Sequence, residues 1–163
     1  MKLPFLLQPS ALSAVAAAAL VAACGGGGTS SSNAPGSLRV AITDAPACGY
    51  DAVNVTVEKV RVHQSASAGD ADSGWSEVVL NPARKLNLLD LTNGVLAELG
   101  QTELPSGSYS QLRLQLAGNG MGAPYANSLV LTGGDGSEIP LDTPSAQQTG
   151  LKMNLNLTVQ PNQ

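Results

Sequence analysis

The sequence predicts an all-β domain, an antiparallel β-sandwich with about seven strands and at most one short helix. Apolar residues alternate with polar ones over several short segments, which is the period of a strand with one buried face. Turns rich in Gly and Pro separate these segments, and helical spacing is confined to one short stretch. Short strands joined by such turns are typical of a sandwich.

The first two strands are predicted over 38–42 and 53–62. Both segments alternate, and a turn containing Pro and Gly over 44–49 separates them. Within the second segment the phase of the alternation reverses across Glu58 and Lys59, as a β-bulge or a local twist requires.

The middle of the chain has a weaker pattern. After a polar loop, residues 75–80 predict a short strand, and the Leu spacing over 86–91 predicts a strand that gives way to a turn. Residues 92–99 are the one helical candidate, with Thr92 as N-cap and Gly100 as the residue that ends it.

Three further strands are predicted in the C-terminal third. A turn at 104–107 leads into 109–116, where Leu alternates with Gln and Arg. Residues 128–132 are a short candidate. Residues 151–159 show the cleanest period of two in the chain.

The composition limits the class of protein. A hydrophobic fraction of 43% excludes bulk disorder, and an aromatic fraction of 3% leaves aliphatic side chains to fill the core. The formal net charge is −4, so no basic surface is available for a phosphate backbone, and we expect no nucleic-acid partner.

Residues 1–23 have the pattern of a lipoprotein signal peptide. Lys2 precedes an apolar stretch, which ends in the tetrapeptide Val21-Ala22-Ala23-Cys24. This tetrapeptide resembles a lipobox, and the thiol of Cys24 can carry a diacylglyceryl thioether. We therefore expect cleavage before Cys24 and a lipid anchor on that residue.

Two other fates of this segment are open. The stretch can stay in the membrane as a helix, although Pro9 and the many Ala residues weaken that interpretation. It can also be removed at an ordinary Ala-x-Ala site, which would release the protein.

Lipid anchoring predicts a location in the cell envelope, with the membrane as a partner. Gly25 follows the modified residue, and by resemblance to enterobacterial sorting it favours the outer membrane if the producer is Gram-negative. Residues 24–36 are Gly- and Ser-rich and form a flexible tether, which leaves 37–163 as the β-sandwich domain.

A series of motifs occurs in order along the domain. They are Ala41 to Pro46, Asp51 to Val57, Val60-Arg61-Val62-His63, Gly74-Trp75, Leu88 to Gly94, Leu104 to Tyr109 with Gln111 to Leu114, and Ser145 to Lys152. As a set they resemble domain-of-unknown-function family 4382. The resemblance implies a lipid-anchored or secreted bacterial domain with a prealbumin-like sandwich, and it implies no molecular role.

Similar proteins usually continue beyond the position of Gln163 with further strands. The resemblance therefore implies a C-terminally truncated version, in which a missing edge strand leaves unpaired backbone groups that invite association. A Cys in those further strands would be the partner of Cys48. From the residues alone, Cys48 is a free thiol, an intermolecular bridge or a buried inert thiol.

Metal sites have weak candidates, and we expect no cofactor. The single His, His63, fits a structural side chain at a strand end, and one His with one uncommitted Cys does not make a zinc site. The weak metal candidates are the carboxylates Asp44, Asp51, Asp70 and Asp72. Turn hydrogen bonds and a solvated loop explain them as well, and the Ca²⁺-loop pattern fails because its twelfth position is Asn81.

Trp75 and Tyr109 have two interpretations. They can stack on a sugar, or Trp75 can pack in the core while the Tyr109 hydroxyl bonds to nearby backbone. The motifs of nucleophilic and nucleotide-binding enzymes are absent from the sequence, so we expect no catalytic residue and no enzyme activity.

Three functions remain open. The first is a non-enzymatic module that binds an envelope protein or a glycan. The second is a structural or assembly domain that pairs through an exposed edge strand. The third is a hydrolase that uses two carboxylates drawn from Asp44, Asp51, Asp90 and Asp142.

Overall fold

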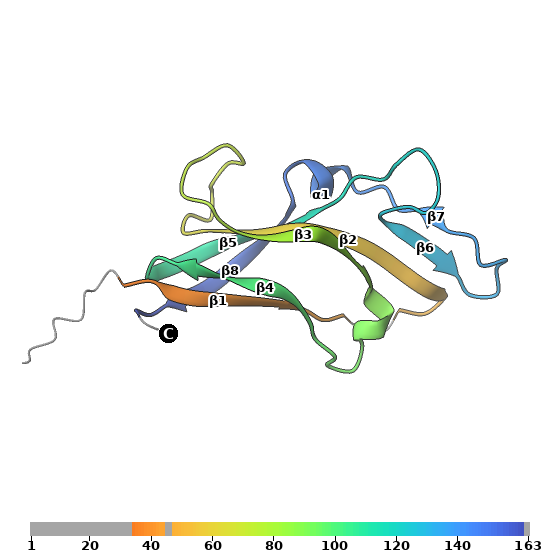
Figure 1. The fold of residues 1–163 in the computed structure, drawn as a ribbon, viewed down its shortest axis with the longest axis horizontal. Coiled ribbons are helices and arrows are strands. Elements are labelled where there is room, and N and C mark those ends of the chain that lie inside the picture. Colours follow the sequence, from red (N-terminus) through yellow and green to blue (C-terminus); the bar gives the residue numbers. More distant parts are fainter. Residues whose placement is uncertain (1–33, 45–46, 162–163) are drawn as a thin grey trace, which may run out of the picture.

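The computed structural model describes residues 34–44 and 47–161. The expected signal peptide and Cys24 lie outside the described residues, as do Ala45 and Pro46. The elements in chain order are β1 (Gly36–Ile42), β2 (Tyr50–His63), β3 (Ser76–Asn87), the 3-10 helix η1 (Leu88–Leu91), β4 (Ala97–Leu104), β5 (Gly107–Leu116), β6 (Ser128–Leu131), β7 (Ile139–Pro140), α1 (Pro144–Gln148) and β8 (Leu151–Val159). The predicted all-β sandwich is confirmed (Figure 1).

Two antiparallel sheets form the sandwich. The large sheet has the order β7-β6-β2-β5-β8, with β3 also pairing with β2, and the small sheet consists of β1 and β4. Strand β3 pairs with residues 54–62 of β2, whereas β6 pairs with 50–54 and β5 with 57–63. Strands β5 and β6 therefore follow one another along the edge of β2 that β3 does not use.

The predicted phase reversal in the second strand is present. The pairing register of β2 shifts between Val57 and Lys59 toward both β3 and β5. Because of this shift, the valines on both sides of it point into the core, and their exposed fractions are 0% at Val57 and 1% at Val60.

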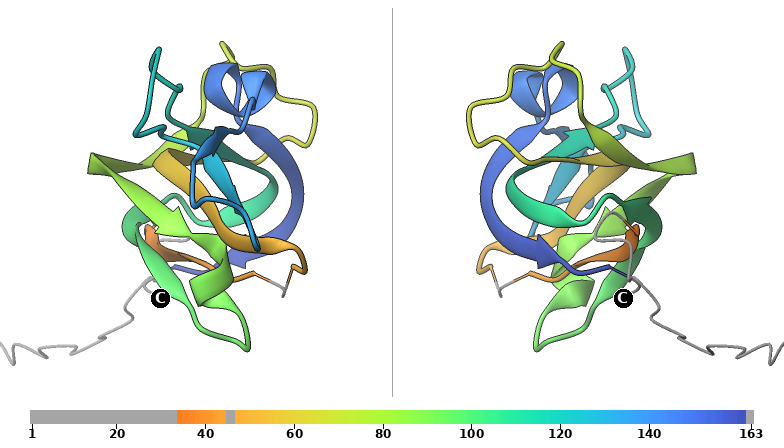
Figure 2. Two further views of the ribbon diagram at one scale, coloured as in Figure 1. Left: turned by 90° about the vertical axis from the view of Figure 1, so that its right-hand side faces the viewer. Right: turned by 90° about the vertical axis from the view of Figure 1, so that its left-hand side faces the viewer.

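The core has two clusters of apolar side chains. The larger cluster lies around Val57, Val60 and Leu116 between the sheets. The smaller one contains Val62, Leu104, Tyr109 and Val159, against which Leu38, Leu155 and Leu157 pack. Figure 2, seen along the longest axis, shows the large sheet curving so that β8 bends toward the small sheet. This curvature brings the end of β8 beside the beginning of β1 (Figure 1).

The predicted helix over 92–99 is wrong. Helical structure occurs earlier, in η1, where the Asn87 side chain accepts a hydrogen bond from the Leu89 amide, and Thr92 ends this helix rather than capping a new one. Residues 97–104 form β4, which pairs with β1 and buries Ala97 and Leu99. Pairing with β1 therefore determines the structure of this segment, although the spacing of its apolar residues also fits a helix.

Gly100 does not end a helix but lies inside β4. Its φ is +138°, and a Cβ atom there would lie 2.8 Å from the Val78 Cγ1 atom of the facing sheet. Glycine is therefore required by both the backbone conformation and the close approach of the two sheets.

The two strands predicted over 75–80 and 86–91 are one strand. Strand β3 runs from Ser76 to Asn87, and the register shift opposite Val57 and Lys59 leaves the residues around Pro82 outside regular pairing. The short helix α1 was not predicted from the sequence; it places Ala146 in the larger core cluster.

Asparagine side chains hold the long loop between β5 and β6. Asn127 is fully buried, its Oδ1 accepts from the Thr56 amide at 3.0 Å and its Nδ2 donates to the Ala117 carbonyl at 2.7 Å. The Asn127 amide in turn donates to Oδ1 of Asn119 at 2.6 Å. These bonds fasten both ends of the loop to β2 and β5.

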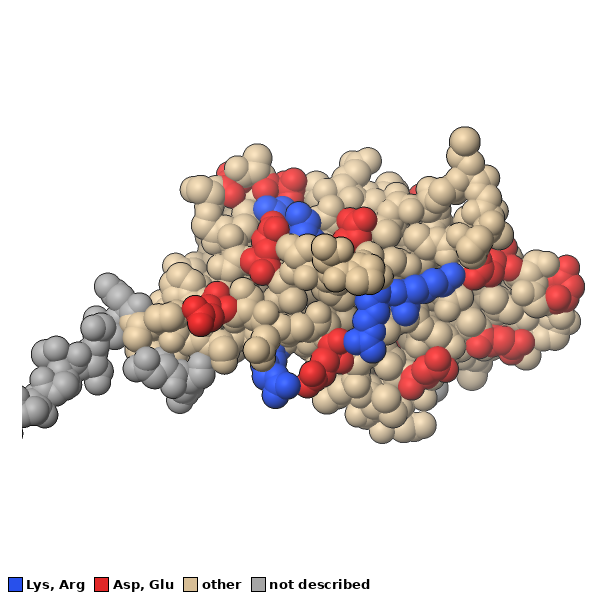
Figure 3. Space-filling model, viewed as in Figure 1, with Lys and Arg blue, Asp and Glu red and all other residues tan. Residues whose placement is uncertain are grey.

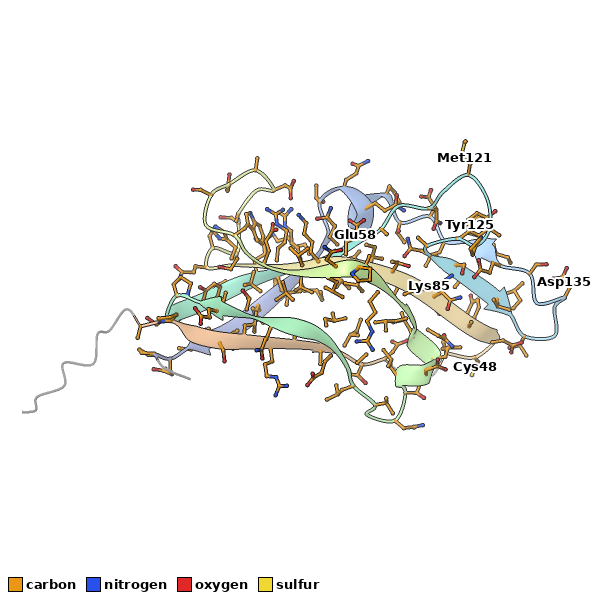
Figure 4. The ribbon with its side chains drawn as sticks, in the orientation of Figure 1. Cys48, Glu58, Lys85, Met121, Tyr125 and Asp135 are labelled. Carbon is orange, nitrogen blue, oxygen red and sulfur yellow. The ribbon has the colours of Figure 1, made fainter. Side chains whose placement is uncertain are left out.

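A second set of bonds connects the loop between β5 and β6 to β3 and to the residue before β7. Lys85 on β3 donates to the Tyr125 carbonyl at 2.7 Å (Figure 4). It also pairs with Glu138 at 3.0 Å. The Tyr125 amide donates to the other Glu138 oxygen at 2.9 Å. This amide bond and the neighbouring Lys85 lower the pKa of Glu138 below its ordinary value.

We predict that Asn127→Ala lowers the free energy of unfolding by about 3 kcal/mol, because the buried Thr56 amide and Ala117 carbonyl lose their partner. Urea unfolding followed by circular dichroism measures the loss. The matched control is Gln101→Ala on an exposed position of β4, which should change stability by less than about 0.5 kcal/mol. Equal effects of the two variants would contradict the role of Asn127.

Candidate functional site

Three of the four weak metal candidates have side-chain hydrogen bonds or ion pairs. Asp51, at the start of β2, accepts from the Thr132 hydroxyl at 2.7 Å. Asp44 is held through its backbone, since its amide donates to the Leu91 carbonyl at 3.2 Å. Asp72 accepts from the Gly69 amide at 2.8 Å, and Asp70 pairs with Arg61. Within residues 34–44 and 47–161, no three His, Cys, Asp or Glu side chains gather as a metal centre requires.

The two remaining carboxylates of the hydrolase hypothesis belong to different segments. Asp90 accepts from Nδ2 of Asn87 at 3.1 Å beside η1, and Asp142 is exposed in the segment before α1. Asp51 lies at the start of β2, where β6 pairs with it. None of the hypothesis's four carboxylates lines the apolar cleft described below.

His63 and Cys48 lie in different surroundings. The Ser65 amide donates to Nδ1 of His63 at 2.8 Å, so the proton is on Nε2, which donates to the Ser73 carbonyl at 3.0 Å. Both ring nitrogens are thus used to hold the loop between β2 and β3. Cys48 is exposed in the turn after β1 and is a free thiol in the described part of the chain (Figure 4).

Trp75 does not pack in the core, so that interpretation is wrong. It lies on the other face of the large sheet, where the guanidinium carbons of Arg61 and Arg113 are 4.6 Å and 4.9 Å from its ring centre. Arg61 and Arg113 are direct neighbours in the pairing of β2 with β5. The indole Nε1 donates to the Gly69 carbonyl at 3.0 Å, which ties the ring to its own loop.

The loop over 64–75 and these side chains form a polar layer on the outer face. The Arg113 side chain is only 9% exposed, and it donates to the carbonyls of Ala68 at 2.8 Å and Thr149 at 3.1 Å. Gln111, beside it, is fully buried. Asp70 and Glu77 pair with Arg61, so the charges of the layer are balanced within the layer itself. This balance favours a covering role over an anion site.

Tyr109 has the backbone bond that one interpretation predicted. Its hydroxyl donates to the Pro105 carbonyl at 3.0 Å, and the residue is 2% exposed. The ring therefore packs in the smaller core cluster and is not available to stack on a sugar.

A cleft of about 420 Å³ lies between the two sheets on the side where β1 faces β8. This volume lies within the range of ligand pockets. Its lining is almost wholly apolar: Val40, Ala41, Ile42 and Thr43 come from β1 and the residue after it, Leu99 from β4, and Val60, Leu112, Leu114 and Met153 from the large sheet. We name this feature the apolar cleft.

The apolar cleft is open because β8 is packed against β1 at one end only. Near the end of β8, Leu157 and Val159 join the smaller core cluster together with Leu38 of β1. Near its beginning, Met153 and Leu151 remain 43% and 45% exposed. These two side chains extend the apolar surface of the cleft to the edge of β8.

Two unpaired strand edges flank the apolar cleft. Among the described residues, β8 pairs with β5 alone and β1 pairs with β4 alone, so each has an edge without a neighbouring strand. No charged side chain lines the cleft. On the face that Figure 3 shows, acidic and basic side chains are interspersed and form no extended patch of one sign.

Sequence reasoning singled out none of the cleft residues as a site. Apart from Thr43 and Leu99, each of them belongs to a strand whose alternation was visible, but their shared exposure depends on how far β1 and β8 diverge. Among the described residues, no helix has the length and apolar character needed to cross a membrane.

We predict that Arg113→Leu lowers the urea midpoint and the free energy of unfolding by about 2 kcal/mol, because two carbonyls lose a charged donor. Fluorescence of Trp75, the single Trp in the chain, should shift to longer wavelength in the folded state as the polar layer loosens. Arg113→Lys, which keeps the charge, is the matched control and should lose less. Unchanged fluorescence in the Leu variant would contradict the packing described.

The geometry can be compared with known proteins. Residues 35–163 match the family described as Domain of unknown function (DUF4382), and this range includes every strand and helix of the structure. No curated protein matches the chain. No solved structure matches it either, so the prealbumin-like sandwich stays a prediction. Because the match covers far more than half of the sequence, this chain belongs to the DUF4382 family.

Proposed function

We propose that this protein is a membrane-anchored extracytoplasmic lipoprotein whose domain is a non-enzymatic binding module. The module accepts an extended segment of a partner protein along β8. One observation carries the proposal: an apolar cleft of about 420 Å³ lies beside strand edges without a neighbour in the described residues.

The combination of cleft and edge favours an extended peptide over the other ligands considered. A strand that adds to a sheet needs backbone donors and acceptors for its main chain, and pockets for every second side chain. The unpaired edge of β8 offers the first, and the cleft beside Met153 offers the second. The two aromatic residues considered for stacking on a glycan are not free to do so, because Tyr109 is buried and Arg61 and Arg113 lie over the Trp75 ring.

The sequence around Cys24 supports the membrane anchor. A lipid on Cys24 and the polar tether up to residue 36 would hold the domain away from the bilayer. The twelve residues from Cys24 to Pro35 span about 40 Å when extended. The domain can therefore reach partners in the envelope while it stays anchored.

The lining of the apolar cleft supports a non-enzymatic role. A carboxylate hydrolase needs two carboxyl groups that face one cleft. Asp44 and Asp90 both lie at η1, where the Asp44 amide donates to the Leu91 carbonyl. The apolar cleft is lined by neither of them, nor by Asp51 or Asp142.

We predict that the full chain incorporates radiolabelled palmitate and partitions with membranes, and that Cys24→Ala abolishes the incorporation. The physical reason is that Cys24 carries the only thiol at the lipobox position. Cys48→Ala is the matched control, because it removes the other cysteine and should leave labelling unchanged. Labelling that persists in Cys24→Ala would refute the anchor.

We predict that a photo-crosslinking amino acid placed at Met153 captures an extended segment with alternating apolar residues in living cells. Mass spectrometry of the crosslinked peptide identifies the segment. The matched control is the same amino acid at Val79, which is 64% exposed on β3 and does not line the cleft. Capture of equal strength at both positions, or none at Met153, would count against binding along β8.

A further inference from the structure

We infer that the strand which pairs with β8 is β8 of a second copy of this chain. The two copies would form a twofold dimer in which the large sheets join edge to edge through antiparallel β8 strands. This inference rests on the proposed function and names the partner of the same edge.

The edge of β8 has one of the features that keep strand edges apart and lacks the others. Its pairing with β5 shifts register between Asn154 and Leu157. Over nine residues it contains one charge, Lys152, and no Pro. Sheet edges that remain single usually combine several charges, a Pro, a bulge or a very short strand.

The other edges of the large sheet have these features. Strand β3 contains Pro82 and the charged residues Glu77, Arg84 and Lys85. Strand β7 is two residues long, and one of them is Pro140. Within the described residues, β8 is thus the long edge of the large sheet that is left ready to pair.

The sequence of β8 is complementary to itself when reversed. If Asn154 faces Asn154 of the second copy, Leu151 faces Leu157 and Met153 faces Leu155. On the opposite face Lys152 meets Asn156. Every pair joins apolar with apolar or polar with polar, and no like charges meet. The pairing requires the free edge of β8 to be regular from Leu151 to Leu157, a segment in which the pairing of β8 with β5 shifts register.

The apolar faces of the two strands also coincide. Met153 and Leu151 lie opposite Leu112 and Leu114 in the pairing of β8 with β5, on the side of the apolar cleft. When two strands pair edge to edge, side chains that lie opposite each other point to the same face of the joined sheet. The exposed Met153 and Leu151 side chains of each copy would therefore pack against Leu155 and Leu157 of the other.

The expected tether does not offer such a strand. Residues 24–33 contain no side chain larger than Thr or Asn, and therefore none that fills an apolar cleft.

Two membrane tethers fit this dimer. The beginning of β1 lies beside the end of β8, so pairing centred on Asn154 places the two tethers at opposite ends of the joined strands (Figure 1). Five residues separate Asn154 from Val159 in each copy, which puts the tethers about 33 Å apart. Each tether can extend about 40 Å, so both anchors reach one membrane. Confinement to a membrane raises the effective concentration and favours a weak pairing.

The test is a disulfide crosslink in membranes. The full chain carries Cys48→Ser, so that no exposed thiol remains in the domain, together with Asn154→Cys. Pairing centred on residue 154 puts the two new thiols directly opposite each other, within the Cα separation that a disulfide needs. Mild oxidation should give a covalent dimer on non-reducing gels.

Lys152→Cys in the same background is the matched control. Residue 152 and its copy are four positions apart along the paired strands, about 13 Å, which is too far for a disulfide. We expect at least tenfold more dimer from Asn154→Cys than from Lys152→Cys. Adding Met153→Lys to the first variant should remove the dimer and leave the circular dichroism spectrum unchanged.

The outcomes separate this inference from the proposed function. Equal dimer from both cysteine positions, or none from either, overturns the pairing of two copies. If the photo-crosslinker at Met153 then captures an extended segment of a different envelope protein, the binding module stands and only its partner changes. If it captures β8 of the same chain, both stand.

Discussion

The register shift in the middle of β2 is the constraint on which the structure depends. Strand β2 is the only strand in the described residues that pairs with three others, and a continuous alternation over its fourteen residues would turn Val60 and Val62 away from the core. With the shift at Val57 and Lys59, one strand lines both core clusters. Strand β8 is connected to β2 through β5, so the position of β8 relative to β1, and the shape of the cleft between them, depend on this central strand.

Much of the fold could be predicted from periodicity, because a strand with one buried face shows alternating apolar and polar residues within its own segment. Strands β1, β2, β5 and β8 alternate visibly, and even the phase reversal at Glu58 and Lys59 could be detected in the sequence. Strand β4 could not, because Ala97 and Leu99 are held by pairing with β1, a contact between residues more than fifty positions apart. Spacing within the segment 92–99 favoured a helix, and the distant partner decided otherwise.

The surfaces beside the core were harder to predict. Gln111 and Arg113 alternate with Leu residues and have the pattern of a solvated strand face, yet the loop over 64–75 covers them and Trp75 lies across the arginine. A loop that folds back over a sheet leaves no period in the sequence. The apolar cleft also leaves no pattern in the sequence, because it results from the divergence of β1 and β8 and not from any residue type.

The neighbouring positions of the beginning of β1 and the end of β8 have a mechanical consequence. If the chain is anchored and binds a partner as proposed, a pull from the membrane would enter the domain at Gly36 and a partner on β8 would resist it close to Val159. That load would pass through Leu38, Leu104 and Val159 of the smaller cluster. The larger cluster around Val57 would lie outside this path.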